Sequence, residues 1–132
     1  MIDIESLQFT RVKSAVVASF STCECQTVDN SATSPKFPYL QFSQKDNPTY
    51  APSIDGGSKE NHVQPMIQID VYTTDTTLKA KQIMAVADTQ MQTDGWQRIF
   101  GPQPLSLTSP YRFTARYQAI VKQNAPNNFT VI

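Results

Sequence analysis

The chain of 132 residues carries little charge: Asp, Glu, Lys and Arg make up 17% of it, and the formal net charge is zero. Globular proteins typically have about 25% of these residues, and here Thr, Ser, Gln and Asn take their place. Without a basic excess, the surface offers no electrostatic footprint for nucleic acid or an anionic membrane. Such a surface suits a protein that neighbours largely cover, and it is equally compatible with an ordinary soluble domain.

Histidine and cysteine are scarce, which limits catalysis and metal binding. The single histidine, His62, lacks the nucleophile and the orienting partner that a general base needs. Cys23 and Cys25 flank Glu24 without the second pair of ligands that zinc sites require. A disulfide between such near neighbours would be strained, so we expect free thiols in a reducing compartment. We therefore expect no catalytic residue, no metal, no cofactor and no enzymatic activity.

Long apolar runs are absent as well. No segment approaches the ~20 apolar residues that span a bilayer. The first residues, Met1-Ile-Asp-Ile-Glu5, are acidic, whereas a signal peptide begins with basic residues. We expect a protein without a signal peptide or membrane segment, which folds in a cytoplasm.

Two stretches have the three- and four-residue spacing of amphipathic helices. The first spans 3–20, with Asp3 or Ser6 as its cap. The second begins after Asp75, the expected N-cap, and ends at Gly95, which suits a left-handed C-terminal cap. Their apolar stripes are Phe9, Val12, Val16 and Phe20 in the first helix, and Ala80, Ile83, Met84, Ala87 and Met91 in the second.

Alternating side chains predict strands at 63–72 and 111–122. In the first, Ile67, Ile69 and Val71 share one face, which we expect to meet the second helix. Shorter strands are expected at 22–28 and 37–42, and a turn-rich link at 101–110. The irregular stretch 44–61 predicts a long loop between antiparallel strands.

This order of elements predicts an α+β fold. We expect a mixed or antiparallel sheet of about four to five strands, with two helices packed on one face and a long inter-strand loop. One domain should span 1–122, followed by an extended C-terminal tail at 123–132. Large aromatics usually lie in cores, and we expect this of Trp96, Phe100, Phe113 and Tyr117.

Several segments follow one another in a distinctive order and spacing: Met1–Ile4, Phe37–Phe42, Glu60–His62 leading into Gln68–Tyr72, Ala80–Ala85, Trp96–Phe100 and Tyr111–Tyr117. In this order they resemble the tail terminator, or tail completion, proteins of long-tailed bacteriophages. Relatives include the tail-to-head joining proteins of siphophages that infect Gram-positive bacteria. The resemblance runs from Met1 to about Lys122 and rests on order and spacing, because each segment alone is common. It does not include the Cys-Glu-Cys stretch or the residues after Gln123.

The resemblance implies a structural virion subunit that forms a hexameric ring on the head-proximal end of the tail tube. The ring would stop tube polymerisation and join the tail to the head. Its partners would be further copies of the chain, the tail tube protein and the head connector or head-completion protein. The genome would pass through the ring without sequence-specific recognition, and assembly would occur in the host cytoplasm.

Three regions are the expected subunit or partner contacts: the 44–61 loop, the arginines on polar strand faces, and the apolar C-terminal tip, which could add a strand to a neighbour. The candidate residues are Tyr50, Ile54, Asp55, Lys59, Glu60, Arg98, Arg112, Arg116, Phe129, Val131 and Ile132.

Two alternatives stay open. One is another neck, head-completion or tail-tube subunit of a phage. The other is a small enzyme or ligand-binding domain that uses the 44–61 loop as a lid, with Asp55, Glu60 and His62 as its polar groups.

Overall fold

The computed structural model describes residues 4–27, 37–46, 62–106, 108, 110–125 and 128–131, with the backbone alone at 62 and at most positions after 122. Part of the predicted contact set lies outside the described residues. These candidates are Tyr50, Ile54, Asp55, Lys59, Glu60 and Ile132, together with the side chain of Phe129.

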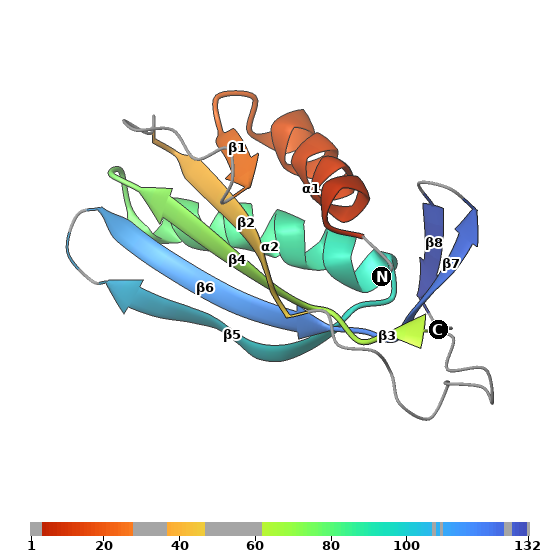
Figure 1. Cartoon of the computed structure of the whole chain (residues 1–132). Helices are drawn as coiled ribbons and strands as arrows, with labels where there is room; N and C mark the ends of the chain where they lie inside the picture. The colour runs from red at the N-terminus through yellow and green to blue at the C-terminus, as the bar shows by residue number, and fades with distance from the viewer. Residues whose placement is uncertain are drawn as a thin grey trace.

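A five-stranded mixed sheet with two helices forms the body of the protein, which confirms the α+β prediction (Figure 1). The strand order is β1-β2-β4-β6-β5. Strands β1 and β2 are parallel, and all other neighbours in this sheet are antiparallel. The strands are β1 (Glu24–Thr27), β2 (Tyr39–Asp46), β4 (Met66–Thr73), β5 (Gln97–Ser106) and β6 (Tyr111–Gln118). The sheet therefore has β1 and β5 as its two edges.

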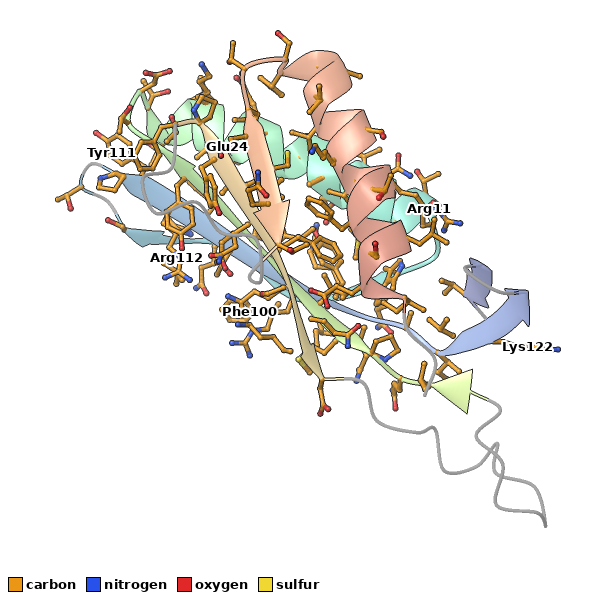
Figure 2. All side chains as sticks on the ribbon, turned by 45° about the horizontal axis from the view of Figure 1, so that its top comes forward. Arg11, Glu24, Phe100, Tyr111, Arg112 and Lys122 are labelled. Atoms are coloured by element: carbon orange, nitrogen blue, oxygen red, sulfur yellow. The ribbon has the colours of Figure 1, made fainter. Side chains whose placement is uncertain are left out.

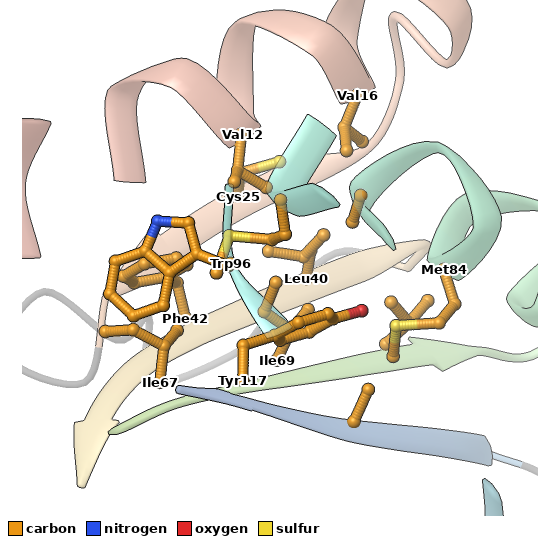
Figure 3. Close-up of a cluster of buried hydrophobic side chains, with 14 of the residues drawn as sticks. Val12, Val16, Cys25, Leu40, Phe42, Ile67, Ile69, Met84, Trp96 and Tyr117 are labelled. Carbon is orange, nitrogen blue, oxygen red and sulfur yellow. The ribbon is translucent and has the colours of Figure 1, made fainter. Parts of the chain in front are cut away.

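Both helices, α1 (Glu5–Ser19) and α2 (Thr77–Thr93), cover the same face of this sheet (Figure 1). The predicted stripe of α2 is wholly buried, and Ile67, Ile69 and Val71 of β4 face it with no exposed surface. Helix α1 buries Val12 and Val16 but also Gln8, while Phe9 and Phe20 are only partly buried. Figure 3 shows these layers meeting in one apolar cluster. The central strand–helix unit was therefore predicted correctly.

The starts of both helices differ from the prediction. Thr76, rather than Asp75, is the N-cap of α2, and its hydroxyl accepts a hydrogen bond from the amide of Lys79. Asp75 instead pairs with the ammonium of Lys79 at 3.0 Å. The N-cap of α1 is Ile4, without a side-chain hydrogen bond. Neighbouring capping residues compete for one position, and the sequence alone ranked Asp75 above Thr76 incorrectly.

The C-terminal residues form strands rather than a simple tail. β3 (His62–Val63), β7 (Val121–Ala125) and β8 (Asn128–Val131) make a second, antiparallel sheet of three strands. The predicted strand 111–122 is thus divided between β6 and β7. The tip pairs with β7 of its own chain, and Val131 packs against the main core.

Candidate interaction surface

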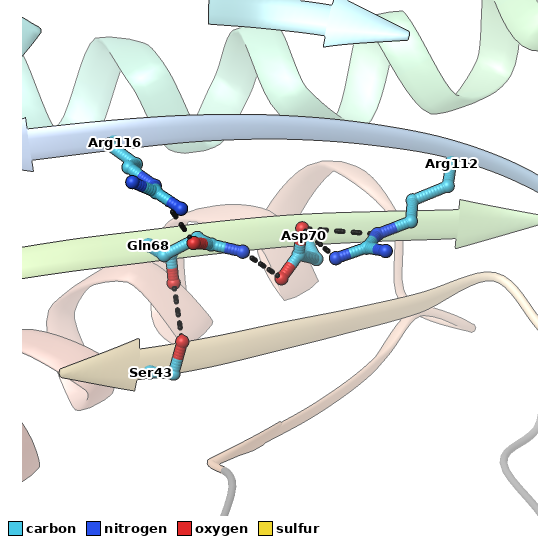
Figure 4. A network of polar contacts seen from close by, with 5 residues as sticks. All are labelled: Ser43, Gln68, Asp70, Arg112 and Arg116. Atoms are coloured by element: carbon cyan, nitrogen blue, oxygen red, sulfur yellow. Dashed lines mark hydrogen bonds and ion pairs between the residues drawn. The ribbon is translucent and has the colours of Figure 1, made fainter. Parts of the chain in front are cut away.

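Neither described helix covers the second face of the five-stranded sheet (Figure 1). The central strands present polar side chains on this face (Figure 4). On β4, these alternate with the apolar residues that face α2. In the register of the sheet, Gln68 lies opposite Ser43 and Arg116, and Asp70 lies opposite Thr114. We call this surface the helix-free face.

Asp70 is the only acidic side chain in the network of Figure 4, and it is 3% exposed. The Nε–H and Nη2–H groups of Arg112 donate to its Oδ1 at 3.3 and 3.1 Å. Gln68 donates to Oδ2 at 2.9 Å. A buried carboxylate is costly unless it is paired and hydrogen-bonded. Both oxygens of Asp70 meet that requirement, so this pair fixes Arg112 in place.

Arg116 has a different environment, because its partner is neutral. Its Nε–H donates to Oε1 of Gln68 at 3.0 Å, and the residue is exposed. Among the described side chains no carboxylate pairs with it. The helix-free face therefore carries two guanidinium groups and, within this network, one carboxylate.

Aromatic rings flank both guanidinium groups. The guanidinium of Arg112 lies 5.4 Å from the ring centroid of Tyr72, and that of Arg116 lies 5.9 Å from that of Phe100. Figure 2 shows Arg112 and Phe100 on the side of the sheet away from α1. Cation–π contacts at exposed sites contribute about 0.5–1 kcal/mol, and here they also restrict where each side chain points.

Strand β5 forms an exposed apolar edge next to this face. Ile99, Phe100 and Leu105 are 43%, 42% and 50% exposed. Ile99 and Leu105 each lie at a shift in the register between β5 and β6. Two expectations are therefore wrong: Phe100 is not in the core, and much of the supposed 101–110 link belongs to a strand. Pro102 and Pro104 suggested a turn, yet an edge strand tolerates proline.

The third candidate arginine, Arg98, lies elsewhere. It donates to Oδ1 of Asp88 on α2 at 2.9 Å, and the same oxygen accepts a 2.6 Å hydrogen bond from the buried Tyr117 hydroxyl. Arg98 thus ties β5 to α2, whereas Arg112 and Arg116 share the helix-free face. Of the other candidates, Val131 is half-buried against the core.

The predicted contact set lacks Gln68 and Asp70 of the helix-free face, and Ile99 and Leu105 of the β5 edge. A signal did exist for Asp70. A carboxylate between Ile69 and Val71 in a predicted strand must find a partner if the strand is central. For Ile99 and Leu105 no comparable signal was available, because their exposure follows from the irregular register of β5.

The cysteines are free, as predicted, and both are buried. A hydrogen bond with Cys25, followed by burial, raises the pKa of the Cys23 thiol. The same hydrogen bond lowers the pKa of Cys25. Within the described residues, no group of three or more His, Cys, Asp and Glu side chains could hold a metal ion. No described helix is long and apolar enough to cross a membrane.

A small pocket lies near the start of β5, lined by Gln64, Gly95, Gln97, Gln118, Ala119 and Ile120. Its volume of about 160 Å³ is below the ~300–1,000 Å³ of typical small-molecule sites. Within the described part of the chain, the helix-free face and the β5 edge are the candidate surfaces for recognition of a macromolecule.

Comparison with known proteins adds no identification. No model of a known protein family matches the chain, and no curated protein matches it either.

Proposed function

We propose that this chain is a tail terminator subunit of a long-tailed bacteriophage, which assembles into a ring of six copies, by analogy with that family, on the head-proximal end of the tail tube. The ring would stop tube growth and present a surface for the head connector. The sequence resemblance supplies the identity of the particle and of the partners. The α+β fold is compatible with this role.

The structural observation that best supports self-assembly is the exposed apolar edge of β5. Every residue of this strand is exposed or half-exposed, and three large apolar side chains project from it. An exposed strand edge with apolar residues is a surface that proteins usually cover or protect. A neighbouring copy that covers it would remove both the apolar area and the open edge from water.

A ring also requires contacts of a particular kind. A head-to-tail interface joins one patch of a subunit to a different patch of the next copy. Such contacts form a closed ring when the rotation between copies divides a full turn evenly. Edge β5 and the opposite edge β1 differ in length and burial, so a β5 contact need not be twofold. This arrangement is compatible with a heterologous interface.

The first test is the mass of the purified protein, measured by light scattering over a wide concentration range. A hexamer supports the proposal. A monomer makes capping the deciding experiment, in which the protein is added to polymerising tail tube protein. Monomers that also fail to limit tube length would refute the proposal, whereas filaments of the purified chain would favour a tail-tube subunit.

A further inference from the structure

We infer that the helix-free face binds an acidic segment of a protein partner, with Arg116 as the principal carboxylate-binding residue. The inference deepens the proposed function, on which it rests for the identity of the partner. The site consists of Arg112, Thr114 and Arg116 in one row of β6, with Tyr72 and Phe100 beside it.

The charge on this face is the first reason. Asp70 already satisfies Arg112 through two hydrogen bonds. Arg116 uses only Nε–H, on the neutral oxygen of Gln68, and its terminal nitrogens donate no described hydrogen bond. A carboxylate accepts two parallel N–H bonds from a guanidinium in a geometry that Lys cannot reproduce. Among the described residues, none occupies the terminal nitrogens of Arg116, so a carboxylate could bind there.

The second reason is an unsatisfied hydroxyl. Thr114 is 3% exposed, and its Oγ1 has no hydrogen-bond partner. Strand alternation places it between Arg112 and Arg116 on the same face. Buried polar atoms without a partner are uncommon in folded proteins. An acceptor that entered between the two guanidinium groups would bring an oxygen toward this hydroxyl.

The third reason is that the site is already ordered. The Phe100 ring and the amide of Gln68 hold Arg116 from two sides. Gln68 is held in turn by Asp70, toward which it donates. A side chain that is fixed before binding loses less conformational entropy when a partner arrives. Phe100 also connects the site to the apolar β5 edge, so a partner could combine acidic and apolar contacts.

The favoured occupant is a protein carboxylate rather than a nucleic-acid phosphate. The chain has no net charge, and nucleic-acid-binding surfaces are usually strongly basic. Two arginines beside a buried aspartate suit one or two acidic side chains. A long polyanion would need a larger basic surface.

The experiment measures fluorescence anisotropy at low salt with a labelled short peptide of Glu, Gly and Leu, and with a counterpart in which Gln replaces Glu. We expect binding of the Glu peptide to be about tenfold tighter, the size expected for charge-assisted hydrogen bonds. Arg116→Gln should remove this difference and Arg116→Lys should reduce it. Lys122→Gln is the control, because it removes an exposed positive charge on β7, outside the site.

Equal affinity for the two peptides would overturn the inference, as would an unchanged Glu preference in Arg116→Gln. Stronger binding of a labelled oligothymidine that also depends on Arg116 would replace the protein partner with nucleic acid. The urea midpoint of each variant shows whether it is folded. Because peptide binding needs no ring, a failure here is distinct from a failure of the proposed assembly.

Discussion

The hydroxyl of Tyr117 on β6 donates a 2.6 Å hydrogen bond to Oδ1 of Asp88 on α2. The Tyr117 side chain has no exposed surface, and this contact gives its one polar atom a partner. Arg98 donates to the same carboxylate from β5. The helix is therefore joined to two adjacent strands through one acidic residue.

This relationship makes stability sensitive to alkaline pH. Burial, followed by the hydrogen bond to Asp88, raises the pKa of Tyr117 above its ordinary value of 10.0. The unfolded chain therefore releases this proton first as the pH rises. The contribution of Tyr117 to the free energy of unfolding is complete below a pH of about 10 and decreases above it.

We expect Tyr117→Phe to lower the free energy of unfolding by about 1 kcal/mol at neutral pH, because one hydrogen bond is lost while Asp88 keeps its other partners. The variant should also lose less stability than the wild type between about pH 9 and pH 11. Urea titrations at these pH values measure both effects. Burial also raises the pKa of Tyr72. The pH dependence of stability in Tyr72→Phe is therefore a second comparison with the wild type. Parallel pH profiles for wild type and Tyr117→Phe would contradict the assignment.

Arg112 and Arg116 should differ in their effect on folding, although they share one face. Arg112→Met leaves Asp70 buried without its cationic partner, and we expect a loss of about 2 kcal/mol. Arg116→Met removes an exposed side chain with a neutral partner, so the loss should be below about 1 kcal/mol. Chemical denaturation of the two variants is a matched comparison. A larger loss for Arg116→Met would show that the roles are reversed.

Gly95 and Gly101 both have positive φ, and they differ in how much room a side chain would find there. At Gly101 (φ +72°) a Cβ would overlap the carbonyl oxygen of Thr114, which is backbone and cannot move away easily. At Gly95 (φ +94°) the nearest atom would be Cγ1 of Val131, at 3.1 Å. We expect Gly95→Ala to cost about 1 kcal/mol and Gly101→Ala to cost clearly more. Thermal unfolding of both variants tests the order, and equal losses would mean that β5 shifts to accommodate the side chain.

Sequence periodicity predicted the central part of the fold well. The stripe of α2 and the Ile67–Val71 face of β4 were read correctly, since each pattern repeats over several residues. Gly95 was also read correctly as a residue in the left-handed region. The helix stripe, the strand face and the glycine could be predicted because each depends on local backbone geometry and on which face is buried.

The candidate surface was only partly predictable. Arg112 and Arg116 were placed together because they alternate along one strand. Arg98 was grouped with them, yet its partner Asp88 lies on α2, and sequence spacing does not report such a contact. Strand β5 was missed because its prolines and irregular register conceal the alternation of a strand. Tertiary pairing with β6 overrides that local signal.

The β5 edge gives the last prediction, which concerns assembly. If a neighbouring copy covers this edge, Ile99→Lys together with Leu105→Lys should place two charges in the interface and lower the oligomer mass, because buried unpaired charges are costly. Both side chains are exposed in the single chain, so the urea midpoint of the double variant should differ little from that of the wild type. Leu78→Lys is the control, as Leu78 is 62% exposed and lies on α2 rather than on β5. Light scattering compares the three proteins at equal concentration. An unchanged hexamer mass in the β5 variant would exclude this edge from the interface, while the same loss in Leu78→Lys would point to a general effect of added charge.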